Sequence, residues 1–159
     1  MTDYMATLRK IVGNAPLLQC GASVILINER GELLLQKRHD NSCCGFHGGG
    51  VELYEAVEDA ACRELLEETG LTATSLELFG VFSSPELSYI YPNGDEVSNI
   101  DIVFLCHEYT GELKPQSDEV RELCFFATLD LPADISPPQK PVLQRYLERY
   151  GTGATPARR

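Results

Sequence analysis

The 159-residue chain carries 13 basic and 24 acidic side chains, which gives a formal net charge of −11. This charge argues against binding to DNA or RNA through the phosphates, because such binding needs a basic surface. Hydrophobic residues make up 43% and charged residues 23%, which is typical of a folded globular chain and not of a disordered one. A small anionic substrate stays compatible with the charge if local cations or a metal neutralise it.

No apolar run is long enough to span a bilayer, and residues 1–14 lack the continuous apolar segment of a signal peptide. We therefore expect a cytoplasmic protein with no membrane partner. The length fits one compact domain, expected over residues 1–150, followed by a disordered tail over residues 151–159. A homodimer is compatible with the sequence.

Six cysteines are spread along the chain, and most lie in apolar runs, where a thiol behaves as a small buried hydrophobic group. A disulfide scaffold is not expected in a chain of this length without a secretory signal. Cys43, Cys44 and His47 are a conceivable zinc-binding set. The chain has no C-x-x-C pair, however, and this disfavours a structural zinc site.

The N-terminal half predicts a short amphipathic helix over residues 4–12, which ends at Gly13. The apolar runs 20–27 and 32–37 flank a turn over residues 28–31, and together they predict a β-hairpin. A loop follows over residues 39–50. It ends in three glycines, which allow the backbone to approach a ligand closely.

The second half predicts a helix over residues 55–69, rich in Ala, Glu, Leu and Arg and followed by Gly70. Strands are expected at 76–83, 97–108 and 122–127, with a loop over 85–95, and a final helix is expected over 138–150. Helices and strands interleave without a regular βαβ rhythm, which favours a layered α+β fold with a mixed sheet.

Glu64, Glu67 and Glu68 share one face of the expected helix over 55–69, because residues three and four apart are neighbours. They continue a stripe that begins with Val57 and Ala60. The carboxylates repel one another, burial adds a desolvation cost, and the C-terminal end of a helix disfavours negative charge. A divalent cation such as Mg²⁺ or Mn²⁺ would offset all three effects. The alternative is a solvated acidic helix end, and the helix alone does not decide between the two.

The residues around these glutamates have fixed spacing. Five residues separate Gly49 from Glu55, and seven more separate Glu55 from Arg63. The pattern over residues 49–71 resembles the Nudix box, which is matched here by Gly49, Glu55, Arg63, Glu64, Leu65, Glu67, Glu68, Gly70 and Leu71. The resemblance extends over about residues 18–150 and implies a Nudix-like α/β/α sandwich with a mixed β-sheet core.

The resemblance also implies roles for these residues. Glu64 and Glu68 are expected to bind Mg²⁺ or Mn²⁺, and Glu67 is a further ligand or the base that activates water. The carbonyl oxygen of Gly49 is expected to complete the metal shell. As a second candidate base, Glu119 lies on an expected loop beyond the box, where a solvated acid is the alternative.

The same resemblance implies that Arg63 orients carboxylates of the box by pairing with Glu55 or Glu67. Many family members carry Pro at the position of His47 and Trp at the position of Cys44. His47 is therefore either a phosphate donor or a solvated loop residue. The substrate-binding residues expected from the box and the aromatic positions are Glu52, Glu55, Phe46, His47, Tyr89 and Tyr91.

The implied reaction is metal-dependent hydrolysis of the diphosphate linkage in a nucleoside diphosphate joined to another moiety. ADP-ribose, a nucleotide sugar, a nucleoside triphosphate and a dinucleoside polyphosphate stay open as substrates, because Pro85 and the pair Tyr89 and Tyr91 favour different classes. An RNA 5′ end is disfavoured by the acidic charge. The alternative function is a non-catalytic nucleotide-sensing Nudix domain, which the intact set of box carboxylates disfavours.

Overall fold

The computed structural model describes residues 4–39, 42–115 and 120–151. The expected base Glu119 and the expected tail from residue 152 onward lie outside the described residues. Within them, no helix has the length and apolar character needed to cross a membrane.

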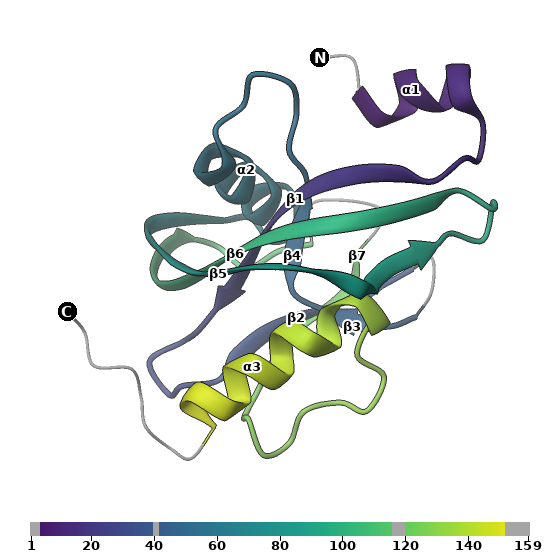
Figure 1. Cartoon of the computed structure of the whole chain (residues 1–159). Coiled ribbons are helices and arrows are strands. Elements are labelled where there is room, and N and C mark those ends of the chain that lie inside the picture. The colour runs from purple at the N-terminus through teal and green to yellow at the C-terminus, as the bar shows by residue number, and fades with distance from the viewer. Residues whose placement is uncertain (1–3, 40–41, 116–119, 152–159) are drawn as a thin grey trace.

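The described residues form three α-helices, one short 3₁₀ helix and seven strands, so the chain is α+β as expected (Figure 1). The helices are α1 (Tyr4–Val12), α2 (Val57–Thr69) and α3 (Lys140–Tyr150), and the 3₁₀ helix η1 (Pro137–Gln139) leads into α3. The strands are β1 (Leu17–Leu26), β2 (Leu33–Arg38), β3 (Cys44–Gly45), β4 (His47–Gly50), β5 (Leu71–Ile90), β6 (Glu96–Gly111) and β7 (Val120–Phe126).

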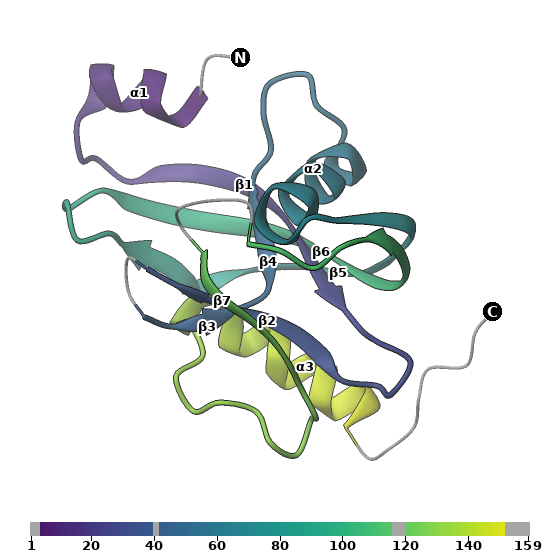
Figure 2. The same cartoon turned by 180° about the vertical axis from the view of Figure 1, so that it is seen from behind.

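The strands form two sheets. The larger sheet has the order β4-β1-β6-β5, with β1 parallel to β6 and the other pairs antiparallel, so it is mixed as expected. The smaller sheet has the order β3-β2-β7 and is antiparallel in both pairs. Helices α2 and α3 lie on opposite sides of the strands, as the two views in Figures 1 and 2 show. This arrangement confirms the expected layered α/β/α fold.

The hairpin expected from residues 20–37 is wrong. Strand β1 pairs in parallel with β6, a partner far along the chain, whereas β2 belongs to the other sheet. One isolated bridge, between Ile27 and Leu33, connects the ends of the two runs. The turn itself does form, since the amide of Gly31 donates to the carbonyl of Asn28. The turn is encoded by residues that are close in the sequence. The sheet that each strand joins depends instead on partner strands far along the chain.

Two expected loops are partly strands. The segment 39–50 contains β3 and β4, which pair with β2 and β1. The expected loop over 85–95 is shorter, because β5 continues to Ile90 along β6 through several register shifts, one of them between Ser83 and Ser88. These bulges interrupt the alternation of polar and apolar residues, and a sequence pattern therefore ends the strand too early.

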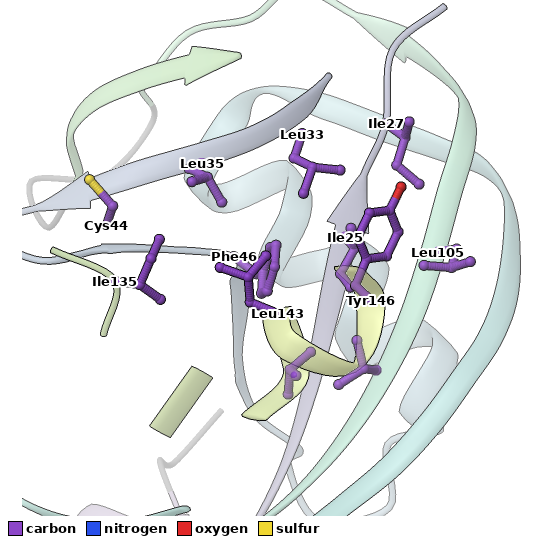
Figure 3. Close-up of a cluster of buried hydrophobic side chains, with 12 residues drawn as sticks. Ile25, Ile27, Leu33, Leu35, Cys44, Phe46, Leu105, Ile135, Leu143 and Tyr146 are labelled. Atoms are coloured by element: carbon purple, nitrogen blue, oxygen red, sulfur yellow. The ribbon is translucent and has the colours of Figure 1, made fainter. Parts of the chain in front are cut away.

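Two hydrophobic clusters hold the layers together. In the first, Phe46 and strand residues of both sheets pack against Leu143 and Tyr146 of α3 (Figure 3). In the second, Ala60, Ala61 and Leu65 of α2 pack onto the opposite face of the larger sheet. Complete burial of a leucine such as Leu65 contributes about 2 kcal/mol. This packing fixes the rotation of α2 and so the direction of its glutamates.

The cysteines differ from expectation. None of the six cysteines, which all lie within the described residues, forms a disulfide, as expected, but only Cys44 and Cys106 are buried, and Cys20 and Cys124 are exposed. Burial, together with the nearby Asp134, raises the pKa of the Cys44 thiol to about 11.

Candidate active site

Glu64 of α2 lies directly over the glycine strand β4. A Cβ atom on Gly49 would lie 2.5 Å from the carboxyl carbon of Glu64, so only glycine permits this approach. The side chain of Glu64 is 16% exposed. Burial raises its pKa, the hydrogen bond and charge of Arg63 oppose this, and the neighbouring Glu68 and Glu67 raise it again. Glu64 is thus a partly buried carboxylate whose ionised form a metal cation would stabilise further.

Glu68 is held more tightly than Glu64. Its side chain is 7% exposed, and its Oε2 accepts hydrogen bonds from Nε2 of Gln36 at 2.9 Å and from the amide of Gly48 at 3.1 Å. The imidazole Nδ1 of His47 lies 3.6 Å from the same oxygen. Gln36 comes from β2 and Gly48 from β4, so strands of both sheets meet at this carboxylate.

Arg63 connects the carboxylates of the box. Its Nε and Nη2 donate to the two oxygens of Glu55 at 2.8 and 2.9 Å, and its Nη1 donates to Oε1 of Glu64 at 2.6 Å. The carbonyl of Gly50 accepts a further bond at 3.1 Å, and Glu67 lies 3.6 Å away. Both partners expected for Arg63 therefore lie beside it, and Glu55 is the closer one. Arg63 lowers the pKa of Glu55 through this pairing.

The comparison with known families decides what this arrangement is. A family model described as the NUDIX domain matches residues 17–146. The chain belongs to the Nudix hydrolase family.

Individual relatives fit this assignment. The ADP-ribose pyrophosphatase of Methanocaldococcus jannaschii is 40% identical over 110 residues, covering 67% of this chain and 61% of the relative. The NAD-capped RNA hydrolase NudC of Vibrio cholerae is 32% identical over 111 residues, covering 69% of this chain and 38% of the relative. This chain thus spans about three fifths and two fifths of these two relatives.

The solved structures give the same fold. The crystal structure of a MutT NUDIX hydrolase from Burkholderia pseudomallei aligns with a TM-score of 0.69 and 28% identity, covering 81% of this chain and 98% of that structure. The two chains therefore share the layered fold described above. We call helix α2, which carries the box glutamates Glu64, Glu67 and Glu68, the Nudix helix.

Nudix enzymes typically depend on a divalent metal. In the described part of the chain, no three His, Cys, Asp or Glu side chains already converge as a ready-made metal site. The donor set nevertheless fits a hard cation, because the buried Glu68 and the partly buried Glu64 are carboxylates next to the glycine backbone of β4. Burial raises the pKa of Glu64, and a bound cation would offset this by favouring the ionised form.

A cavity of about 160 Å³ lies between the two sheets, next to η1. Its wall includes Gly48 and Gly49 of β4, which lie against Glu68 and Glu64, but none of its lining residues belongs to α2 itself. Three of the expected substrate-binding residues, Phe46, Tyr89 and Tyr91, line it. The rings of Tyr89 and Tyr91 are in edge-to-face contact, with centroids 4.9 Å apart. The other lining residues are Gln19, Gly21, Ser23, Gln36, Arg38, Gly45, Gly48, Gly49, Leu87, Asn99, Asp101, Ser136, Pro138 and Gln139.

The remaining expected residues lie outside this cavity. Glu67 of α2 is 56% exposed and lies beside Arg63. Glu52 is partly buried and lines a second hollow with Glu64 near α1. His47 is fully buried, so the expectation of a solvated loop residue is wrong, and it is not among the residues that line the cavity. It is buried because β4, which the sequence suggested was a loop, pairs with β1 at this position.

The sequence did not single out Gln36, Ser23 or Asp101. Oγ of Ser23 donates to the carboxylate of Asp101, at 2.8 and 3.0 Å from its two oxygens. Burial raises the pKa of Asp101 to about 6, and the bond from Ser23 opposes this shift. One feature of the sequence indicates Asp101. It is an acidic residue inside the apolar run over 97–108, and acidic residues are unusual for a strand in the middle of a sheet.

Proposed function

We propose that this Nudix chain hydrolyses the diphosphate linkage of a nucleoside diphosphate joined to another moiety, and that it uses Mg²⁺ or Mn²⁺ to do so. The observation that carries the proposal is the pair of carboxylates, the partly buried Glu64 and the buried Glu68, that α2 directs onto the glycine strand β4. Such a pair is unfavourable alone and becomes favourable with a divalent cation. The names of the relatives, a pyrophosphatase and a NAD-cap hydrolase, agree with this chemistry.

Glu64, Glu68 and the carbonyl of Gly49 are the proposed metal ligands. When bound, the metal neutralises phosphate oxygens and lowers the pKa of a coordinated water. Gln36 and the amide of Gly48 both donate to Oε2 of Glu68, which leaves Oε1 as the ligating oxygen. The protein thus orients this carboxylate before any substrate arrives.

Glu67 is the proposed general base. It is the most exposed of the three glutamates, so water can reach it, and it lies 3.6 Å from Arg63. Arg63 is a positioning residue, because its guanidinium holds Glu55 and Glu64 in place. Glu119 stays the alternative base and lies outside the described residues.

The cavity between the two sheets is the proposed site of the nucleoside. Tyr89 and Tyr91 offer an aromatic surface to a base, and Phe46 contributes apolar area. Glu52 and Glu64 line the second hollow. We propose that the other product of the hydrolysis leaves through this hollow. The substrate classes proposed are ADP-ribose or a nucleotide sugar, and a nucleoside triphosphate.

The test measures release of nucleoside monophosphate or phosphate from ADP-ribose, UDP-glucose, dGTP and diadenosine tetraphosphate, with Mg²⁺ or Mn²⁺. We expect Glu67→Gln and Glu68→Gln each to lower kcat at least about 100-fold, because one removes the base and the other a metal ligand. Glu58→Gln is the matched control, since Glu58 is exposed in the first turn of the same helix. It should change kcat less than about twofold.

Two results would count against the proposed function. Full activity in EDTA, or unchanged kcat in both variants, would exclude the metal-carboxylate mechanism. Tight binding without turnover across the whole panel would instead identify a nucleotide-sensing Nudix domain.

A further inference from the structure

Asp101 is a carboxylate that the proposed hydrolysis does not use, although it lines the cavity. It lies on β6, where it is paired in register with Gly21 of β1. A Cβ atom on Gly21 would lie 3.5 Å from Oδ1 of Asp101. Because residue 21 is glycine, the space beside this oxygen is part of the cavity. Asp101 keeps some solvent exposure for the same reason.

Ser23 fixes the orientation of this carboxylate. Its hydroxyl can donate one hydrogen bond, and it lies within hydrogen-bond distance of both oxygens of Asp101. An ionised carboxylate accepts about four hydrogen bonds, so most of the accepting capacity of Asp101 stays open after Ser23 is satisfied.

Other polar groups in the cavity are also acceptors. Oε1 of Gln36 is buried and accepts no hydrogen bond within the described part of the chain. Nε2 of the same amide donates to Glu68 and to the carbonyl of Phe46. Nδ2 of Asn99 donates to the carbonyl of Leu87, which leaves the Asn99 amide oxygen for a ligand.

This wall of the cavity therefore suits N–H or O–H groups and repels phosphate oxygens. The cation in the lining, Arg38, belongs to β2 in the other sheet. A metal at the proposed site on α2 would attract the phosphates of a nucleotide, and its nucleoside would then lie toward Asp101.

We propose that Asp101 selects the nucleoside half of the substrate by accepting hydrogen bonds from two adjacent donors. The presence of a nucleotide in this cavity rests on the proposed function. Two parts of a nucleoside carry such a donor pair, namely the N1–H and 2-amino groups of a guanine-type base and the cis-diol of a ribose. Asp101 is a specificity-determining residue in either case, because a ligand without the pair leaves its carboxylate unsatisfied.

The test is equilibrium binding of nucleoside monophosphates by titration calorimetry with Mg²⁺ present. These ligands have no diphosphate bond to cleave, so the measurement does not depend on turnover. Recognition of the base predicts that GMP binds about 10-fold or more tighter than AMP, with IMP in between and dGMP equal to GMP. Recognition of the ribose predicts that GMP and AMP bind alike and that dGMP binds about 10-fold more weakly.

Asp101→Asn should remove the preference in both cases, because an amide presents a donor where the carboxylate presented an acceptor. Asp130→Asn is the matched control, since Asp130 is exposed outside the cavity. Equal binding of GMP, AMP and dGMP to the unaltered protein would overturn the proposal without any variant. Unchanged discrimination in a folded Asp101→Asn protein would overturn it as well. Failure of hydrolysis with this preference intact would count against the proposed function alone.

Discussion

The side chains of Gln36 and Glu68 join the smaller sheet to the Nudix helix, with Nε2 of Gln36 2.9 Å from Oε2 of Glu68. Both side chains are buried, and the same nitrogen also donates to the carbonyl of Phe46 at 3.1 Å. A residue of β2 thereby determines which oxygen of Glu68 stays open for a metal. The position of the proposed metal site depends on both sheets and not on α2 alone.

Gln36→Leu should weaken metal binding, because Oε2 of Glu68 keeps only the amide of Gly48 as a close donor. Loss of a residue that orients a metal ligand typically costs 10- to 100-fold in affinity, and we expect about 10-fold for Mn²⁺. Titration calorimetry or the electron paramagnetic resonance of free Mn²⁺ measures this. Gln144→Leu is the control, since Gln144 bonds only to Glu148 on the exposed face of α3. Equal Mn²⁺ affinity in both variants would show that Gln36 does not orient Glu68.

Gly49→Ala should abolish metal binding, because the new methyl group would occupy the place of the Glu64 carboxyl group. The neighbouring Gly50→Ala is the matched control. A Cβ atom there would meet only the flexible amide end of Gln19, at 3.2 Å. We expect Gly49→Ala to lose at least about 100-fold in kcat/KM and Gly50→Ala to lose less than about fivefold. Similar losses of kcat/KM in the two variants would mean that the close approach of residue 49 to Glu64 does not affect activity.

The box residues were predictable because their spacing along one helix already places their side chains together. Gln36 and Asp101 were not, because each is a single polar residue in an apolar strand, and the sequence does not say which helix or strand it will face. The expected hairpin over 20–37 failed for a related reason. The turn at 28–31 is encoded locally, whereas the pairing of β1 with β6 depends on residues about 80 positions away.

Tyr54 is fully exposed and has a φ angle of 68°, a left-handed conformation that costs a bulky residue about 1 kcal/mol. Tyr54→Gly should therefore raise the free energy of unfolding by about 0.5 kcal/mol, once the greater freedom of glycine in the unfolded chain is subtracted. Urea unfolding at neutral pH measures this change. Leu53→Gly is the control, because the exposed Leu53 has no positive φ and should lose stability. Destabilisation by both changes would contradict the assigned strain.

Asp101→Asn should stabilise the folded protein at pH 8. Burial raises the pKa of Asp101 from 3.8 to about 6, so the folded state above pH 6 carries an ionised carboxylate that the unfolded state ionises more easily. This lowers stability at high pH, and the loss disappears as the pH falls through 6 toward 3.8. The shift corresponds to about 3 kcal/mol, and partial exposure reduces the expected gain to about 1–2 kcal/mol.

The measurement is urea unfolding of both proteins at pH 8 and at pH 4. The gain in the Asp101→Asn protein should be present at pH 8 and nearly absent at pH 4, where the carboxyl group is largely protonated in the folded state. The amide oxygen of asparagine can still accept the bond from Ser23, so that contact is retained. Asp130→Asn, a change at an exposed position, should give the same small difference at both pH values. An Asp101→Asn protein that is less stable at pH 8 would show that the carboxylate is stabilised by contacts stronger than the bond from Ser23.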